Sequence, residues 1–137
     1  MGRLIGIDFG TKRVGIAVTD PLKISAHGLQ TVHAKDAITF IKDYAKNENI
    51  EKFIVGMPKN LKNEPSQSAE QLKPFINKLK EQLPGIPVEY IDERFTSKMA
   101  QQTMVAAGLK KKKRQDKAMV DTISATIILQ SYLEKKV

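Results

Sequence analysis

The sequence contains no cysteine and no tryptophan, and aromatic residues make up only 6% of its 137 positions. Without cysteine there is no disulfide, no thiolate zinc site and no cysteine nucleophile, which suits a reducing cytoplasm. So few aromatic rings argue against a broad surface for stacking bases. There is no apolar run of about 18 residues, and the short apolar stretch at 4–7 meets Asp8 at once. We therefore expect neither a membrane span nor a signal peptide.

Positive charge is what the sequence has in excess. It holds 23 Lys+Arg against 15 Asp+Glu, for a formal net charge of +8. Such a surplus favours a polyanionic partner, either nucleic acid or an anionic membrane surface. Residues 110–117 contain six of the basic residues and one acid, so much of the surplus lies in one short segment. The length predicts a single domain over 1–137, and 41% hydrophobic residues are enough for one core.

Hydrophobic periodicity predicts the element order β-β-β-α-β-α-β-α-α. The expected strands are 3–9, 14–19, 27–33, 52–57 and 88–91. The expected helices begin near Asp36, Ser68, Ser97 and the end of the basic run, with Asp36 and Ser68 as candidate N-terminal caps. Right-handed crossovers would place the later strands beside the first one. The sequence therefore predicts an α/β protein with a mixed five-stranded sheet, three antiparallel strands followed by two parallel ones, and helices on both faces.

Acidic residues fall at the ends of the strands that this topology makes neighbours. Asp8 lies near the end of the central first strand, and Asp92 and Glu93 follow the fifth strand. Asp121 lies inside the last helix, on the face that carries Ala125, Ile128 and Tyr132. Sites in open α/β sheets form at the carboxyl ends of strands. We therefore take Asp8, Asp92, Glu93 and Asp121 as candidate catalytic residues.

Carboxylates that converge repel one another, and a divalent cation removes that conflict. Oxygen ligands without cysteine or histidine suit Mg²⁺ or Mn²⁺ rather than zinc. One or two such ions beside a phosphodiester would support in-line hydrolysis, with an activated water and a stabilised leaving oxygen. Two alternatives stay open. Asp8 could instead accept the amides of Gly10 and Thr11 in the turn, and Asp92 and Glu93 can both bind a metal only if the strand has ended, because neighbouring strand residues face opposite ways.

Basic residues flank these acids. The candidates for contact with nucleic-acid phosphates are Lys12, Arg13 and Arg94 near the acids, and the run Lys110, Lys111, Lys112, Lys113 and Arg114 before the last helix. Other polar residues are typical of local structure. Asp20 precedes a proline in a turn, Asp116 suits a helix cap, and His27 and His33 lack the companions of a metal site.

Four segments together resemble the YqgF family, also called RuvX. They are GIDFGTKRVGIAVTD at 6–20, VGMPKN at 55–60, YIDERFTS at 90–97 and KKKRQDKAMVDTISATIILQSYL at 111–133. The resemblance implies an RNase H-like fold and a metal-dependent nuclease that processes the 5′ end of pre-16S ribosomal RNA. By position, it implies Asp8, Glu93 and Asp121 as metal ligands, with Asp92 as the alternative to Glu93. Ribosomal precursors are then the expected partners.

Three other functions fit parts of the sequence. The family's relation to Holliday-junction resolvases makes branched DNA an alternative substrate, and RNA is preferred on the resemblance alone. A non-catalytic RNA- or ribosome-binding module would use the basic run equally well, but unpaired acids beside a phosphate site weaken anion binding without a metal. The Asp-x-Gly-Thr hairpin also resembles the phosphate loop of actin-like and sugar-kinase ATPases, which need two such domains. The sequence leaves the oligomeric state open.

Overall fold

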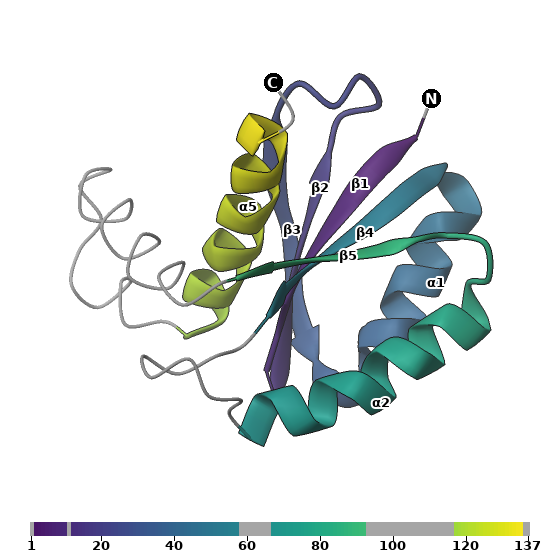
Figure 1. Cartoon of the computed structure of the whole chain (residues 1–137), viewed down its shortest axis with the longest axis vertical. Coiled ribbons are helices and arrows are strands. Elements are labelled where there is room, and N and C mark those ends of the chain that lie inside the picture. The colour runs from purple at the N-terminus through teal and green to yellow at the C-terminus, as the bar shows by residue number, and fades with distance from the viewer. Residues whose placement is uncertain (1, 11, 58–66, 93–116, 136–137) are drawn as a thin grey trace.

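A five-stranded sheet lies at the centre of the computed structural model, which describes residues 2–10, 12–57, 67–92 and 117–135 (Figure 1). The strands within these ranges are β1 (Arg3–Phe9), β2 (Arg13–Thr19), β3 (Ala26–His33), β4 (Ile50–Met57) and β5 (Val88–Asp92). The helices are the short 3-10 helix η1 (Ala34–Asp36), α1 (Ala37–Asn47), α2 (Gln67–Gln82) and α5 (Lys117–Lys135). The helix expected from Ser97 lies outside the described residues. No helix within them is both long and apolar enough to cross a membrane.

The strand order confirms the predicted topology. The sheet runs β3-β2-β1-β4-β5, so β1 is the central strand. β1 pairs antiparallel with β2, and β2 pairs antiparallel with β3. β4 joins the other side of β1 in parallel, and β5 pairs in parallel with β4. Because β1, β4 and β5 run in the same direction, their carboxyl ends meet at one edge of the sheet.

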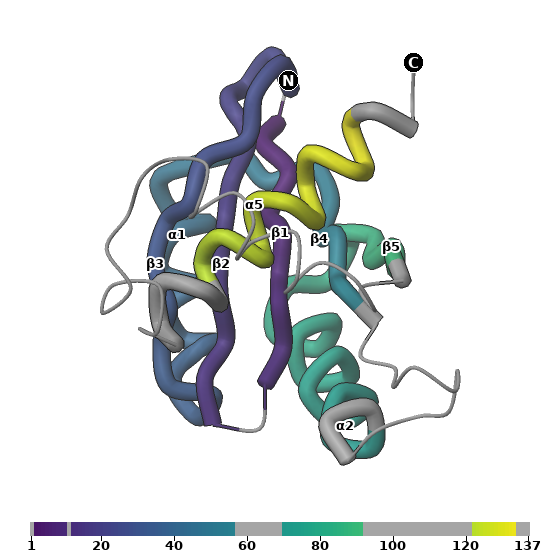
Figure 2. The backbone as a smooth tube through the Cα atoms, turned by 90° about the vertical axis from the view of Figure 1, so that its left-hand side faces the viewer, coloured from purple at the N-terminus to yellow at the C-terminus, as the bar shows by residue number. Residues whose placement is uncertain are grey.

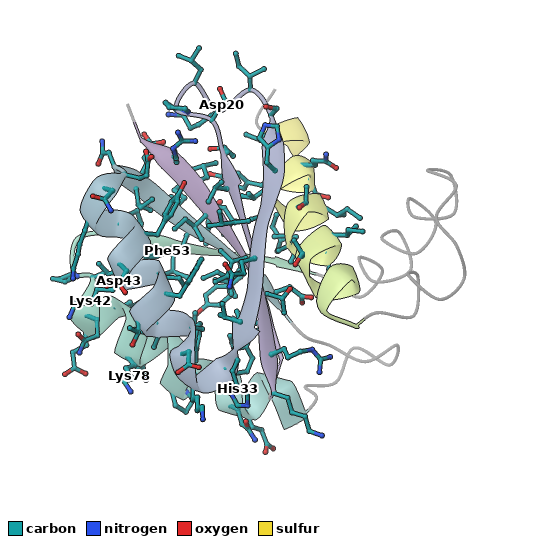
Figure 3. All side chains as sticks on the ribbon, turned by 180° about the vertical axis from the view of Figure 1, so that it is seen from behind. Asp20, His33, Lys42, Asp43, Phe53 and Lys78 are labelled. Carbon is teal, nitrogen blue, oxygen red and sulfur yellow. The ribbon has the colours of Figure 1, made fainter. Side chains whose placement is uncertain are left out.

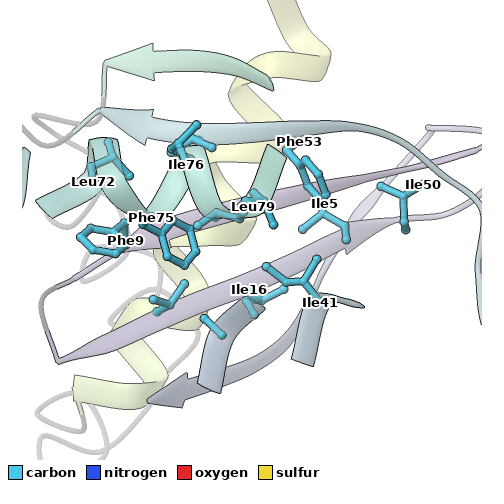
Figure 4. Packing of buried hydrophobic residues seen from close by; sticks show 14 of the residues in the cluster. Ile5, Phe9, Ile16, Ile41, Ile50, Phe53, Leu72, Phe75, Ile76 and Leu79 are labelled. Atoms are coloured by element: carbon cyan, nitrogen blue, oxygen red, sulfur yellow. The ribbon is translucent and has the colours of Figure 1, made fainter. Parts of the chain in front are cut away.

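Helices cover both faces of the sheet, as the sequence predicts. α1 and α2 lie on one face over a large core in which the rings of Phe9 and Phe75 are 4.9 Å apart (Figure 4). The predicted apolar stripe of α2 is buried there, as are the side chains of β1 that face it; these residues are Ile5, Ile7, Phe9, Leu72, Phe75, Ile76 and Leu79. α5 covers the other face with a smaller cluster of Leu4, Ala17, Ile54, Ala125, Ile128, Leu129 and Tyr132.

The predicted cap position at Asp36 is confirmed but without a side-chain bond, and the predicted cap at Ser68 is wrong. Asp36 makes no capping hydrogen bond, because the chain already turns through η1 before α1 begins, and the side chain of His33 accepts the amide of Lys35 instead. α2 begins at Gln67, so Ser68 is a residue of its first turn rather than the residue before the helix. α2 ends at Gln82. Gly85 follows it with a φ of +88°, a conformation that favours glycine.

Candidate active site

Asp8 lies on the face of the central strand that α5 covers. Side chains alternate along a strand, and Ile5, Ile7 and Phe9 all belong to the core under α1 and α2. Leu4 belongs to the cluster under α5, so Gly6 and Asp8 fall on that same face. Asp8 is half-buried, whereas the four residues before it, 4–7, are buried. It therefore stands where the interior opens at the carboxyl end of β1.

Gly10 shapes the hairpin that follows Asp8. A Cβ atom added at Gly10 would lie 2.6 Å from the carbonyl oxygen of Arg13, closer than any real side chain approaches backbone. The chain can thus turn back into β2 directly after β1 only with glycine at this position. The hairpin in turn fixes how β1 and β2 pair, and in this pairing Asp8 lies opposite Gly15.

α5 lies close against the central strand at Gly6. A Cβ atom added there would lie 2.5 Å from Cγ of Leu129 and 2.8 Å from the carbonyl oxygen of Ala125. The helix crosses the sheet diagonally: Thr122 lies against Gly28 of β3, and Tyr132 reaches Lys52 of β4 (Figure 2). Glycines on the strands therefore let the helix lie directly on the sheet.

A hydrogen bond between α5 and β3 also shows where α5 lies along the strands. Asp8 pairs with Gly15, and Gly15 pairs with Thr31 on β3, so these three residues form one row across the sheet. The hydroxyl of Thr31 is hydrogen-bonded to the hydroxyl of Thr122. The first described turns of α5 therefore stand at the level of Asp8.

These two contacts place residue 121 in register with Asp8. Asp121 and Asp92 are described by their backbone alone. Residue 121 lies four residues, or about 6 Å, before Ala125 on the same helix face. Asp8 lies two residues, or about 6.6 Å, beyond Gly6 on the same strand face. Since Ala125 sits against Gly6, and Leu4 and Tyr132 share one cluster, the helix and the strand run past each other in opposite directions. Residue 121 therefore lies toward the end of β1 that carries Asp8.

β5 brings its own acids to the same edge. Ile7, Val55 and Tyr90 pair in one row, and Asp8 and Asp92 lie one and two residues beyond it in the same direction. Along β5, Ile91 packs in the cluster under α5 and Val88 packs in the opposite core. Asp92 is the last residue of β5, directly after Ile91. Glu93 itself lies outside the described residues.

Of the predicted phosphate-binding residues, the structure describes Lys12 and Arg13. Lys12 is exposed next to the hairpin turn, and its carbonyl oxygen accepts the amide of Ala34 at 2.9 Å. Arg13 is half-buried at the start of β2 and pairs with His33. Both follow Asp8 by a few residues and share its edge of the sheet. Arg94 and residues 110–114 lie outside the described part of the chain, as does Asp116.

The remaining polar residues have local partners, as predicted. The side-chain oxygens of Asp20 accept the amides of Leu22, Ile24 and Ser25 at 3.2, 2.8 and 2.8 Å. These bonds lower the pKa of Asp20. Nε2 of His27 lies 2.9 Å from Oγ of Ser25. Among the described residues, no group of three acidic, histidine or cysteine side chains could hold a metal ion.

The carboxylates that the sequence singles out are nevertheless suited to a hard divalent cation. Asp8 offers oxygen at an edge where the core opens, and residue 121 stands in register with it. Oxygen donors of this kind prefer Mg²⁺ or Mn²⁺. The donor chemistry and the register therefore both fit such an ion between β1 and α5.

Sequence reasoning missed the residues that position α5. Gly6 and Gly28 hold the helix against the sheet, and Thr31 with Thr122 sets its level. A signal was present, because a glycine within a strand often marks a place where another backbone approaches closely. The partner of each glycine could be found only in three dimensions.

A fold comparison defines the class of protein. The structure resembles that of RuvC from Thermus thermophilus, solved in complex with a Holliday junction substrate, with a TM-score of 0.56 and 18% sequence identity. The match covers 99% of this chain and 96% of that chain. The chain therefore has the RNase H-like α/β fold, as predicted.

Sequence comparisons then identify the family. The family model described as "RuvX: Holliday junction resolvase" matches residues 2–135. A relative from Bacteroides fragilis is 55% identical over 136 residues, covering 99% of each chain, and one from Flavobacterium psychrophilum is 51% identical over 137 residues, covering all of both. Both carry the name "Putative pre-16S rRNA nuclease". The chain belongs to the RuvX family, a family of hydrolases acting on phosphodiester bonds, which confirms the resemblance and the class of enzyme predicted from the sequence.

Proposed function

We propose that this chain is a metal-dependent nuclease that hydrolyses phosphodiester bonds in structured RNA, at the 5′ end of pre-16S ribosomal RNA. The observation that supports the proposal is the contact of α5 with β1 and β3, which brings the first described turns of α5 toward the end of β1 that carries Asp8. The names of the relatives supply the substrate. The absence of cysteine suits a cytoplasmic setting.

Each candidate residue has a defined task in this proposal. Asp8, Glu93 and Asp121 would hold Mg²⁺ or Mn²⁺, one ion or two, and Asp92 is the alternative to Glu93 as the ligand from β5. When bound, the metal activates water and neutralises the charge that develops on the scissile phosphate. Lys12, Arg13 and Arg94 would hold phosphates beside the acids, and the run Lys110, Lys111, Lys112, Lys113 and Arg114 would hold the flanking backbone.

Branched DNA is the second candidate substrate. The family description names a Holliday junction resolvase, and a four-way junction offers the same phosphate chemistry as folded RNA. Base-specific contacts are not needed for either substrate, because the candidate residues are acids and phosphate-binding cations. The two substrates must therefore be compared directly.

The test uses purified protein with a labelled RNA that spans the 5′ boundary of 16S RNA and a synthetic four-way DNA junction, each with Mn²⁺ or with EDTA. We expect the RNA to be cut in Mn²⁺ and left intact in EDTA. Asp8→Asn removes the charge of a first metal ligand and should lower the cleavage rate by at least about 100-fold. Asp36→Asn is the matched control, because Asp36 is exposed and makes no capping bond, and it should keep the wild-type rate.

Other outcomes would overturn the proposal in distinct ways. Cleavage that persists in EDTA or in Asp8→Asn would contradict a carboxylate-held metal. Cleavage of the junction with the RNA left whole would assign the activity to DNA. Tight RNA binding with no cleavage of either substrate would favour a binding module.

A further inference from the structure

A groove of about 550 Å³ runs along the surface between α1 and α2, on the opposite side of the sheet from α5. Four of the residues that line it are lysines, and one is an acid: Lys35, Lys42, Lys46, Lys78 and Asp43. Figure 3 shows Lys42, Asp43 and Lys78 together on the outer side of the two helices. None of the candidate site residues that the structure describes lines this groove.

The packing of the two helices forms the groove. α1 buries Ile41 and α2 buries Ile76 and Leu79 in the same core, so the helices lie side by side on the sheet. Ile38 and Phe75 stand between them at the base of the groove. Nζ of Lys42 donates to Oε1 of Gln82 at 2.9 Å and links the two walls. The groove is thus a fixed feature of the fold.

The positive charge of this groove is poorly compensated. Asp43 pairs with Lys46 at 3.3 Å, one turn along α1. Within the part of the chain that the structure describes, neither Lys35 nor Lys78 has an acidic partner. A second hollow, beside Leu4, is different, because its lysines Lys23 and Lys52 pair with glutamates at 2.8 and 3.1 Å. Unpaired cations in a concave surface concentrate anions there.

One end of the groove lies near the hairpin that follows Asp8, at the same edge of the sheet but on the face opposite α5. Ala34 and Lys35 line that end, and the amide of Ala34 donates to the carbonyl oxygen of Lys12 at 2.9 Å. Lys12 belongs to the hairpin that follows Asp8. From there the groove follows α1 to Lys46 in its last turn, a length of about 16 Å for 11 residues. A strand that leaves the acidic edge can therefore continue into the groove.

We propose that the groove between α1 and α2 binds the sugar-phosphate backbone of the substrate RNA strand beyond the point of cleavage. This inference rests on the proposed function for the identity of the strand. Lys35, Lys42 and Lys78 supply point charges to successive phosphates, and the exposed Thr39 supplies a hydroxyl. Phe75 is only 8% exposed and offers no ring face for stacking a base. Binding here is independent of sequence and sensitive to salt.

The test compares two pairs of lysines on the same structure. Lys42→Gln/Lys78→Gln removes two charges from the groove, and Lys73→Gln/Lys80→Gln removes two exposed charges of α2 that do not line it. Binding is measured in an Asp8→Asn background, so that the RNA stays intact, against an RNA that ends at the cleavage point and one that continues as a single strand. Lys35→Gln/Lys78→Gln repeats the experiment without disturbing the bond between Lys42 and Gln82.

We expect both groove variants to bind the long RNA more weakly than wild type, and to bind the short RNA equally well. Each phosphate contact on a single strand contributes about 0.7 to the slope of log K against log salt, so two lost contacts lower the slope by about 1.4. The Lys73→Gln/Lys80→Gln control should keep the wild-type slope.

If the groove variants lost equal affinity for the short and long RNAs, the result would show a general charge effect and overturn the inference. An equal loss of affinity in the Lys73→Gln/Lys80→Gln control would overturn it in the same way. An unchanged affinity in both groove variants would overturn it too and assign the groove to another anionic partner. Neither result affects cleavage, by protein that retains Asp8, of the RNA that spans the 5′ boundary of 16S RNA, which tests the proposed function separately. If that RNA is not cut while the long RNA still depends on the groove, the proposed function fails and the groove assignment stands.

Discussion

Replacing Gly6 with alanine would test whether α5 must lie directly on the central strand. The added Cβ would lie 2.5 Å from Cγ of Leu129 and 2.8 Å from the carbonyl oxygen of Ala125, whereas ordinary contacts begin near 3.4 Å. The carbonyl belongs to the helix backbone and cannot rotate away. The helix must therefore move by at least the difference between 3.4 and 2.8 Å, about 0.6 Å, and it carries residue 121 with it.

The expected cost in stability is that of overpacking a well-filled core. Insertions of a single methyl group into such cores destabilise proteins by about 1–3 kcal/mol. Chemical denaturation of Gly6→Ala should show a loss in this range. A strand glycine with free space around it would give the opposite sign, because alanine restricts the unfolded chain.

We expect Gly6→Ala to lower the cleavage rate by more than its loss of folded protein would explain. A displacement of about 1 Å in a catalytic group costs about 100-fold in rate, so a shift of 0.6 Å should lower metal-dependent cleavage by at least about tenfold. Gly85→Ala provides the matched control. Its φ of +88° strains any side chain at a cost of about 1 kcal/mol, yet nothing lies within 4 Å of the added Cβ.

The assay compares cleavage by the two variants at a temperature where both are fully folded, with metal at saturation. Gly85→Ala should cut at the wild-type rate, and Gly6→Ala should not. Equal rates for the two variants would refute the reasoning, because the position of residue 121 would then not depend on the contact between Gly6 and Ala125.

Two further predictions concern hydrogen bonds outside the acidic centre. Thr31→Val and Thr122→Val should each lower the free energy of unfolding by about 1 kcal/mol, and the double variant should lower it no further, because both changes remove the same hydrogen bond. Additive losses in chemical denaturation would contradict the bond. The backbone amides of Ser25 and Ile24 donate to Asp20 and lower its pKa in the folded protein. The charged carboxylate therefore stabilises the fold at pH values above the unfolded pKa of about 3.9. This stabilisation is lost as the pH falls through the lower pKa of the folded state. The difference in Tm between wild type and Asp20→Asn should therefore close in acid, and a constant difference would contradict it.

The sequence predicts the sheet well because its strands differ in pattern from its helices. β1 and β4 are short apolar runs bounded by turns, and the brief connection at 10–12 permits only an antiparallel hairpin. Once β1 is followed by a hairpin and then by helical crossovers, its central place follows from chain handedness. Asp36 occupies the predicted cap position without a side-chain bond, and the cap at Ser68 is wrong, because capping depends on how the chain enters the helix, which the residue type alone does not determine.

The candidate site is predictable only to the level of its strand ends. Asp8 stands out because an acid is rare in a covered central strand. The face of α5 is also predictable, since Ala125, Ile128 and Tyr132 recur at helical spacing and all are buried. The register between α5 and β1 is not, because it depends on where two glycines let a backbone approach. The basic groove was missed for a similar reason, since Lys42 and Lys78 are far apart in the sequence.

The two faces of the sheet have different roles, because one holds most of the buried core and the other positions α5. Under α1 and α2, large side chains such as Phe53, Ile76 and Leu79 fill a thick core, which can absorb small changes by repacking. Under α5 the cluster of buried side chains is smaller, and at Gly6 the backbone of the helix at Ala125 comes close to the strand. A backbone contact has no rotamer to adjust, and any added atom moves the whole helix. The face that buries less apolar bulk is therefore the one that holds residue 121 in register with Asp8.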